Sequence, residues 1–343
     1  MDTFLQLPAS RRLFAFQQVD ETMGLQSVSV EKDFWVCWTL RELFTLPGVG
    51  EHLTFKGGTS LSKAWKLIER FSEDIDIIVD KEALGFGGDS APDMAPSNKQ
   101  RRVRLEKLMD ACRDWVQGTL QAALASRLQA VLGETGWLLE VDPDIADGQC
   151  LLFHYPSVFP RGAAGYVRPV VKIELGARSD DWPHEEKPIQ PYVIEHFPAL
   201  DPTPAFPVRV LAAERTFWEK ACLLHEETFR PAGKPRKIRM ARHYYDLWCL
   251  LRAGVGEKAL ANSALFQRVA EHREVFFRFS WVDYTTHRPG TFRLTPPVEH
   301  LANWKADYAE MLGPMFFGDT PSFEEMIVAA TEFEKTFNAG AVC

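Results

Sequence analysis

Two aspartates, Asp74 and Asp76, are the residues whose spacing points most directly to chemistry. They open the segment DIDIIV (74–79), which is typical of a β-strand. Side chains two residues apart on a strand project to the same face, so we expect the two carboxylates to lie side by side. Two like charges this close repel each other unless a cation bridges them. Hard oxygen ligands favour Mg²⁺ or Mn²⁺, and Mg²⁺ is the usual partner of triphosphates.

A glycine turn precedes this strand, in the order Lys56, Gly57, Gly58, Thr59, Ser60. We expect it to join a short strand to a helix, where backbone N–H groups without intrahelical partners can bind an anion. Glycines also let the backbone approach a phosphate closely. Alone, Asp-x-Asp usually marks a solvated strand edge, and Gly-Gly usually marks a turn. The combination of both motifs around one helix predicts a metal–triphosphate site. The sequence contains no P-loop motif that would offer another phosphate site.

Further acidic and basic residues could complete such a site. Glu174, in VVKIELG (170–176), alternates with apolar residues and is a candidate third carboxylate. Asp246, in RHYYDLWCLL (242–251), lies among apolar residues and needs a partner. Arg242, a bound nucleotide and an active-site lysine all remain open as that partner. Lys220 lies on an amphipathic segment, where a lysine is ordinarily solvated and contributes little to stability.

Two basic stretches stand out in a chain whose net charge is −8: KQRRVRLEK (99–107) and KPRKIRMAR (234–242). Such runs are usually solvated faces, and the net charge argues against a protein that coats nucleic acid indiscriminately. The second run directly precedes the Asp246 segment. Lys234, Arg236, Lys237 and Arg239 are therefore candidates for binding a triphosphate or an RNA backbone through a local basic patch.

Composition places the chain among globular proteins. With 343 residues, 46% hydrophobic and 25% charged, it is long enough for about two domains. Six cysteines without a C-x-x-C pair indicate neither structural zinc nor a disulfide framework, which favours a reducing cytoplasm. No apolar run approaches the roughly 18 residues of a membrane span. We therefore expect a soluble, cytoplasmic protein that does not bind membranes.

Periodicity predicts an α+β fold in two parts, separated by the Pro-rich stretch DPTPAFP (201–207). We expect a mixed α/β domain over residues 1–207 and a helical domain over 208–343. The expected helices and strands of the first part are two helices in 8–47, a strand at 52–55, a helix from Ser60 to about Arg70, a strand at 75–79, a long helix over about 99–132, and strands at 137–141, 151–155, 167–175 and 192–197. The expected helices of the second part are 210–228, 236–253, 256–277, 298–312 and 322–337, the last with a Ser322/Glu325 capping box.

Several of these segments together resemble the nucleotidyltransferase AbiEii/AbiGii toxin family of the polymerase-β-like superfamily. The resemblance lies in VEKDFW (30–35), KGGTSLSKAWKLIERFSEDIDI (56–77), KIE (172–174), LAAERTFWEKACLLHEE (211–227), RHYYDLWCL (242–250) and NWKADYAEM (303–311). It implies an N-terminal nucleotidyltransferase domain, with a mixed β-sheet flanked by helices. It also implies a C-terminal helical domain that completes the active-site cleft.

The resemblance also implies residue roles. Ser72, Asp74 and Asp76 would form the catalytic strand, residues 57–60 would contact phosphate, and Lys220 would neutralise the triphosphate. Either Glu174 or Asp246 would supply the third acidic group, with Mg²⁺ or Mn²⁺ as cofactor.

The implied reaction transfers NMP from an NTP to an acceptor hydroxyl, with the 3′ end of tRNA as the expected acceptor. The implied setting is the toxin of a type IV toxin–antitoxin or abortive-infection system, with a winged-helix antitoxin encoded nearby. Transfer to a small molecule or a protein remains an alternative, as does a catalytically silent NTP-binding module. A purely structural role is the weakest alternative, because it leaves the carboxylate pair unexplained.

Overall fold

The computed structural model describes residues 1–72, 74–160, 168–202, 205–312, 316 and 320–340. Contacts divide the chain into two compact units. The first comprises residues 1–65 and 71–210, and the second comprises residues 66–70 and 211–343. The domain boundary expected between residues 207 and 208 lies three residues before the boundary that the contacts give between residues 210 and 211. The inclusion of residues 66–70 in the second unit was not predicted. In the described part of the chain, no helix is long and apolar enough to cross a membrane.

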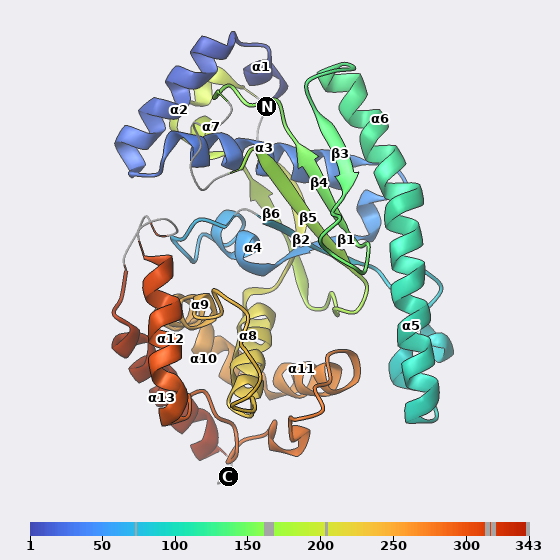
Figure 1. Cartoon of the computed structure of the whole chain (residues 1–343), viewed down its shortest axis with the longest axis vertical. Helices are drawn as coiled ribbons and strands as arrows, with labels where there is room; N and C mark the ends of the chain where they lie inside the picture. Colours follow the sequence, from blue (N-terminus) through green and yellow to red (C-terminus); the bar gives the residue numbers. More distant parts are fainter. Residues whose placement is uncertain (73, 161–167, 203–204, 313–315, 317–319, 341–343) are drawn as a thin grey trace. The chain divides into compact units, whose positions relative to one another are not determined.

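The first unit contains a seven-stranded mixed sheet in the order β3-β4-β5-β2-β1-β7-β6 (Figure 1). Its strands are β1 Leu53–Lys56, β2 Asp74–Val79, β3 Leu138–Val141, β4 Cys150–His154, β5 Val170–Gly176, β6 His184–Ile189 and β7 Phe206–Leu211. The central strand β2 pairs antiparallel with β1 and parallel with β5. This mixed sheet with flanking helices confirms the predicted α+β fold class.

The helices of the first unit include a long one formed by two segments with a single π-turn between them (Figure 1). They are α1 Asp2–Leu5, α2 Ala9–Met23, α3 Ser27–Thr45, α4 Gly57–Lys63, α5 Asn98–Trp115, α6 Gln121–Leu132 and α7 Tyr192–His196. The long helix α5–α6 and the pair α2–α3 agree with the prediction. Trp35 and Trp38 of α3 pack against Phe153 of β4, with ring centroids 5.9 and 6.0 Å apart, which fixes α3 on the sheet.

Two predictions for the first unit are wrong. Residues 192–197 do not form a strand; residues 192–196 form helix α7, because an Asp33 carboxylate oxygen accepts the Tyr192 N–H and the apolar residues pack against α2 and α3. The helix expected to reach about Arg70 begins at Gly57 and ends at Lys63, and Lys66 then adopts a positive φ of 53°. Strands β6 and β7 were not predicted.

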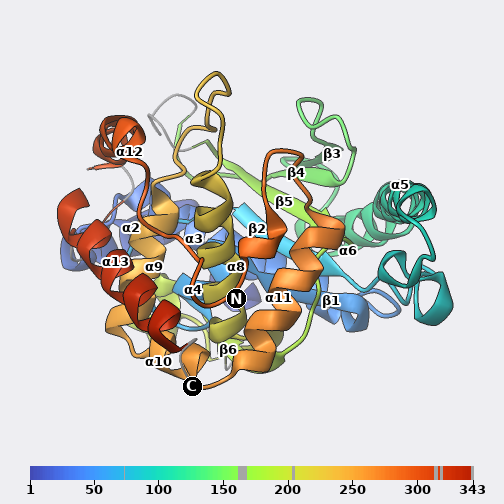
Figure 2. The same ribbon diagram turned by 90° about the horizontal axis from the view of Figure 1, so that it is seen from below.

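The second unit is helical, as predicted. Its helices are α8 Ala213–Glu227, α9 Arg242–Arg252, α10 Val255–Leu260, α11 Ser263–Phe276, α12 Val298–Met311 and α13 Phe323–Ala339. Figure 2 shows α8 between α9 and α11, and contacts with both agree. Trp218 of α8 forms the core with Phe266 and Phe337, whose ring centroids lie 4.7 and 5.2 Å away. The predicted Ser322/Glu325 capping box is present at the start of α13.

Two expected helices of the second unit differ in extent. The one expected from residue 236 starts only at Arg242. The segment 256–277 is divided into α10 and α11 at Asn262, whose side chain accepts the Leu265 N–H and caps α11.

Candidate active site

Asp74 and Asp76 lie on one face of β2, as their spacing predicts. Both are partly exposed, whereas Ile75 and Ile77 are buried on the other face. In the parallel register of β2 and β5, Asp74 lies opposite Lys172 and Asp76 lies opposite Glu174. Paired residues on neighbouring strands share a face. This face of the sheet therefore carries the two aspartates next to one lysine and one further acid.

The glycine turn approaches this face closely. Gly57 adopts φ +81°, and a Cβ atom on it would lie 2.0 Å from Asp76 Oδ2. Only glycine fits such a position without displacing the carboxylate. Lys56 lies opposite Asp76 across the β1–β2 ladder, and its Nζ donates to Ser179 Oγ at 2.7 Å. The first residue of α4 is thus in direct contact with one of the two carboxylates.

The hydroxyl groups around this turn are used within the protein. Thr59 Oγ1 donates to the Asp74 carbonyl oxygen at 2.5 Å and lies 2.8 Å from Ser72 Oγ. Ser60 Oγ donates to the Gly57 carbonyl oxygen at 2.9 Å. Both side chains are buried. They tie α4 to β2 and stabilise its first turn, which leaves the backbone of the turn as the part suited to phosphate.

Glu174 has a basic partner on its own strand. Lys172 Nζ lies 2.7 Å from Glu174 Oε1 and 3.8 Å from Asp142 Oδ2. Burial lowers the pKa of Lys172, but the hydrogen bond to Glu174 and the nearby negative charges together offset this and raise it above the ordinary value. Within the residues that the structure describes, no group of three or more His, Cys, Asp or Glu side chains is arranged to hold a metal ion. The role of Glu174 as a third metal ligand stays a prediction.

The two aspartates nevertheless fit the metal that the motif implies. Mg²⁺ bound with a nucleotide commonly takes one or two protein carboxylates, keeps several waters and uses phosphate oxygens for the rest. Asp74 and Asp76 provide two carboxylates on one face, and the turn at Gly57 brings backbone without a side chain up to Asp76. A third protein carboxylate is not required for this coordination.

The second unit contains a buried charge cluster around Asp246. Arg70 Nε and Nη2 donate to Asp246 Oδ1 and Oδ2 at 2.7 and 2.9 Å, and Lys220 Nζ lies 2.7 Å from Oδ2. Although burial raises the pKa of Asp246, the two cations hold it far below its usual range. Of the partners left open by the sequence, the structure therefore supplies the lysine, and it adds Arg70, which sequence reasoning missed.

Lys220 is not the solvated residue that its helix predicts. Its side chain is 9% exposed and its ammonium faces Asp246. Burial lowers the pKa of Lys220, and nearby Arg70 lowers it further, whereas Asp246 raises it. The expectation that replacing Lys220 leaves stability unaltered is therefore corrected, because the substitution changes a buried cluster.

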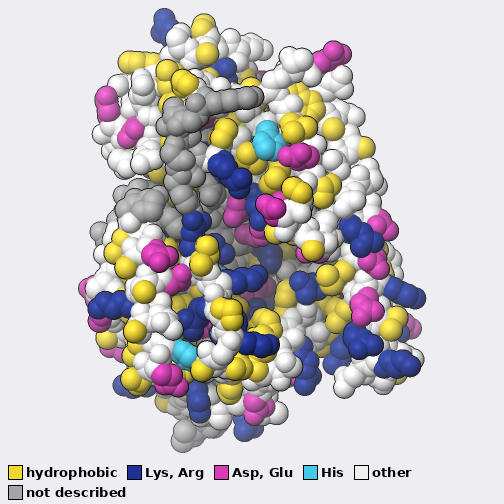
Figure 3. All heavy atoms as spheres, in the orientation of Figure 1, with side chains coloured by type: hydrophobic (Ala, Val, Ile, Leu, Met, Phe, Trp, Pro, Cys, Tyr) yellow, Lys and Arg dark blue, Asp and Glu magenta, His cyan; other side chains and the backbone are white. Residues whose placement is uncertain are grey.

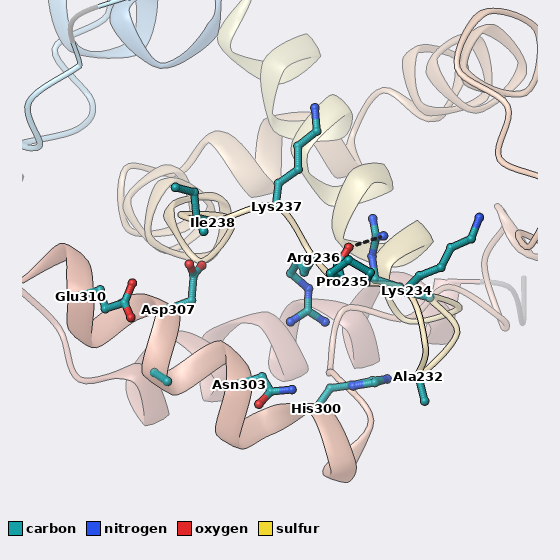
Figure 4. A pocket seen from close by; sticks show the side chains of 12 residues that line it. Ala232, Lys234, Pro235, Arg236, Lys237, Ile238, His300, Asn303, Asp307 and Glu310 are labelled. Carbon is teal, nitrogen blue, oxygen red and sulfur yellow. Dashed lines mark hydrogen bonds between the residues drawn. The ribbon is translucent and has the colours of Figure 1, made fainter. Parts of the chain in front are cut away.

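The second basic stretch lines a pocket of about 340 Å³ together with α12 (Figure 4). Arg236 points toward α12, where its guanidinium lies 3.8 Å from the Trp304 ring centroid. Its Nε also lies 3.2 Å from Oε2 of Glu227, the last residue of α8. Lys237 points away from α12 and is exposed. Lys237 is thus presented to solvent, whereas Arg236 is held within the protein.

The flanks of this stretch are also engaged within the second unit. Lys234 Nζ lies 3.9 Å from the Trp281 ring centroid. The backbone N–H of Arg239 donates to Asp307 Oδ1 at 2.5 Å. The Asp307 contact involves the backbone of Arg239, and Lys234 remains exposed beside Trp281.

The first basic stretch opens helix α5, and Figure 3 shows several Lys and Arg side chains gathered around that end of the helix. Arg104 Nη1 donates to the carbonyl oxygens of Asp89 and Ala91, both at 2.7 Å. Arg102 lies 3.7 Å from Glu106 on the next turn. These contacts account for part of the run as local stabilisation of α5 and the preceding loop.

Comparison with known families shows the family to which the chain belongs. The model of the family described as nucleotidyl transferase AbiEii toxin, type IV toxin–antitoxin system, matches residues 38–334. The chain belongs to the AbiEii family. Members of this family are nucleotidyltransferase toxins, so the chain is an enzyme of nucleotidyl transfer whose substrate is an NTP. Its family assigns it to a system that includes an antitoxin.

Several solved structures are similar to this chain, including the following two. One is MenT4, a nucleotidyltransferase toxin from Mycobacterium tuberculosis, with 17% identity and a TM-score of 0.42 over 97% of this chain and 99% of that chain. The other is JHP933 from Helicobacter pylori, with 14% identity and a TM-score of 0.42 over 92% of this chain and 96% of that chain. No curated protein matches the chain.

Proposed function

We propose that the protein transfers NMP from an NTP to a hydroxyl group at the 3′ end of tRNA, and that Asp74 and Asp76 bind the divalent metal for this reaction. The observation that carries the proposal is the pair of carboxylates on one face of β2, with the backbone of Gly57 directly against Asp76. When bound there, Mg²⁺ would lower the pKa of the attacking hydroxyl and stabilise the pyrophosphate leaving group.

Residues of the chain would bind and orient the nucleotide. The backbone at Gly57 and Gly58 leaves room for phosphate oxygens next to the metal ligands. Lys220 would neutralise negative charge on the triphosphate. No covalent intermediate with the protein is needed, because the acceptor hydroxyl displaces pyrophosphate directly.

Asp246 fits a positioning role better than a role as metal ligand. Its two oxygens already accept hydrogen bonds from Arg70 and lie against the Lys220 ammonium. A metal ion at Asp246 would have to displace one of these cations. We therefore propose that Asp246 holds Lys220 in place, and that Asp74 and Asp76 are the metal ligands.

Metal dependence is tested by removing divalent ions and adding them back. After treatment with EDTA, pyrophosphate release from each of the four NTPs in the presence of total tRNA should vanish. Addition of Mg²⁺ or Mn²⁺ should restore it. Full turnover in EDTA-treated protein would contradict the metal site at Asp74 and Asp76.

The acceptor proposal relies on local positive charge, because a net charge of −8 repels RNA at long range. Lys237, exposed beside the pocket of Figure 4, is the candidate for contacting an RNA phosphate. Lys237→Gln should raise the KM for tRNA and reduce the salt slope of tRNA binding by about one. The matched control is Lys258→Gln, which removes another exposed lysine, on α10, and should change neither quantity.

The alternatives make different predictions in the same assays. Transfer of labelled nucleotide to a small molecule or a protein would leave total tRNA unlabelled while pyrophosphate is still released. A silent NTP-binding module would bind NTP in calorimetry and release no pyrophosphate. Labelled tRNA would support the proposal against both.

The biological setting is part of the proposal. We propose that the chain acts in the cytoplasm, where NTPs and tRNA are found, and that a winged-helix antitoxin is encoded next to it. Expression of the chain alone should slow growth, and co-expression of the neighbouring reading frame should restore it. Unimpaired growth with an active enzyme would contradict the toxin role.

A further inference from the structure

The motif VEKDFW (30–35) contains three consecutive charged residues that are all buried. Glu31, Lys32 and Asp33 of α3 are 2%, 4% and 5% exposed. The motif lies before residue 38, where the match to the family model begins. Charged residues are seldom this buried unless they are paired. The partners of these residues therefore indicate the structural role of the motif.

Asp33 joins α3 to two other helices of the first unit. Its Oδ1 lies 2.7 Å from Lys63 Nζ, and its Oδ2 accepts the Tyr192 backbone N–H at 2.7 Å. The same Lys63 ammonium lies 3.5 Å from the centroid of the Tyr192 ring. Lys63 is the last residue of α4 and is itself buried. The carboxylate thus fixes the end of α4 against α3 and α7.

The beginning of α4 is fixed differently. Gly57 lies against the Asp76 carboxylate, and the Thr59 hydroxyl donates to the Asp74 carbonyl oxygen. Helix α4 has only seven residues, and a helix this short depends on tertiary contacts for its position. Its place beside β2 therefore depends on the anchor at each end.

Burial raises the pKa of Asp33, and the Lys63 ammonium beside it lowers that pKa only in part. Burial lowers the pKa of Lys63, but the adjacent Asp33 carboxylate raises it well above its ordinary value. The ammonium also lies at the C-terminal end of the helix, where the helix dipole favours a cation.

We propose that the Asp33–Lys63 ion pair is a positioning device for the nucleotide site. It holds α4 at the distance from β2 at which the Gly57 turn and the Asp76 carboxylate can meet the same triphosphate. This inference rests on the proposed function of the Gly57 turn in phosphate binding. Loss of the pair lets the far end of α4 move, which shifts the Gly57 turn and weakens NTP binding.

A matched pair of isosteric substitutions on α3 separates positioning from simple stability. Asp33→Asn removes the charge that faces α4. Glu42→Gln is the control, because Glu42 is also fully buried on α3 but its Oε2 accepts from Arg127 of α6, at 2.5 Å. Both variants should lose thermal stability. Only Asp33→Asn should raise the KM for NTP, by on the order of tenfold, since misplacing a site by 1 Å costs up to roughly 100-fold.

Variants at Lys63 add a test of the charge itself. Lys63→Met should raise the KM for NTP as Asp33→Asn does, and Lys63→Arg should restore most of the affinity. Should the single variants fail to fold, the double variant Lys63→Met with Asp33→Asn replaces the ion pair by two neutral side chains of similar size. That variant should fold and still bind NTP weakly. Calorimetric titration with each of the four NTPs and Mg²⁺ provides the affinity without relying on turnover.

The outcomes distinguish this inference from the function on which it rests. A similar KM for NTP in Asp33→Asn and Glu42→Gln, with Gly57→Ala raising it, would overturn the positioning role alone. An unchanged KM in Gly57→Ala would instead remove the Gly57 turn from the nucleotide site, and the positioning role with it. We expect a selective increase in the KM for NTP in Asp33→Asn, a similar increase in Lys63→Met, and an affinity close to that of the wild-type protein in Lys63→Arg.

Discussion

Replacing Asp246 by asparagine is expected to destabilise the second unit strongly. The carboxylate is fully buried and lies within 2.7–2.9 Å of three nitrogens of Arg70 and Lys220. Asp246→Asn leaves these two cations buried without a counter-charge. Breaking a buried pair in this way costs about 3–5 kcal/mol. At roughly 2–4 °C per kcal/mol, the unfolding temperature of this unit should fall on the order of 10 °C.

Lys220→Met provides the comparison, because it leaves the two-point contact of Arg70 with Asp246 intact. It removes one hydrogen-bonded cation and keeps the length of the apolar stem, so the expected cost is about 1 kcal/mol, or a few degrees. NTP binding should nevertheless weaken in this variant. Differential scanning calorimetry gives both unfolding temperatures. Equal destabilisation by Asp246→Asn and Lys220→Met would refute the reasoning that one anion compensates two cations.

The pH dependence of the stability difference between the wild-type protein and Asp246→Asn gives a second check. Arg70 and Lys220 hold the pKa of folded Asp246 far below its usual range, although burial alone raises it. A carboxyl whose folded pKa is depressed stabilises the protein above its unfolded pKa of about 3.9, and this contribution is lost as the pH falls further. The stability gap between the wild-type protein and Asp246→Asn should therefore be constant from pH 7 to 5 and shrink below about pH 4. A gap that grows on acidification would contradict the assignment.

Three further substitutions have defined outcomes. Burial lowers the pKa of His225 to about 3, so the unfolded chain takes up a proton as the pH falls below about 6.5. Between pH 6.5 and 4.5, His225→Asn should therefore reduce the slope of the unfolding free energy against pH by up to about 1.4 kcal/mol per pH unit, measured by urea unfolding. An unchanged slope would contradict the lowered pKa of His225. Gly57→Ala, whose Cβ would meet Asp76 Oδ2, should reduce transfer by about 100-fold, and near-normal transfer would show that the carboxylate can move aside freely. Glu174→Gln should reduce transfer less than about tenfold, whereas a loss near 100-fold would make Glu174 a third metal ligand.

Local patterns in the sequence predicted much of the geometry of the candidate site on β2. The alternation of Asp74, Ile75, Asp76 and Ile77 is a property of one strand, so it predicted correctly which side chains share a face. The Ser322 capping box likewise depends on four consecutive residues. Sequence spacing does not show how close Gly57 comes to a carboxylate 19 positions later, because the chain between them has to turn back first.

Contacts between distant segments could not be predicted in this way. Arg70 and Asp246 are 176 positions apart, and neither segment alone shows that they meet. The only signal was an acid among apolar residues at Asp246, which required an unidentified partner. Lys220 looked solvated because a lysine on an amphipathic helix usually is, yet the partner that buries it lies on α9.

Secondary structure failed where tertiary contacts override propensity. Tyr192, Val193 and Ile194 favour a strand by composition, but the Tyr192 N–H is bound by Asp33 and the segment turns into α7. Strand β6, HEEKPI, is mostly exposed at one end of the sheet order and has no apolar alternation to reveal it. Its pairing within the sheet, and not its own side chains, makes it a strand.

The most direct test of the central claim is nucleotide transfer by Asp76→Asn, compared with the wild-type protein. Labelled NTP, Mg²⁺ and total tRNA are supplied to both proteins, and labelled RNA is measured. The metal site at Asp74 and Asp76 predicts a loss of at least about 100-fold. Thermal stability should be kept or increased, because one of two adjacent like charges has been removed. Unchanged transfer by folded Asp76→Asn in Mg²⁺ would contradict the claim.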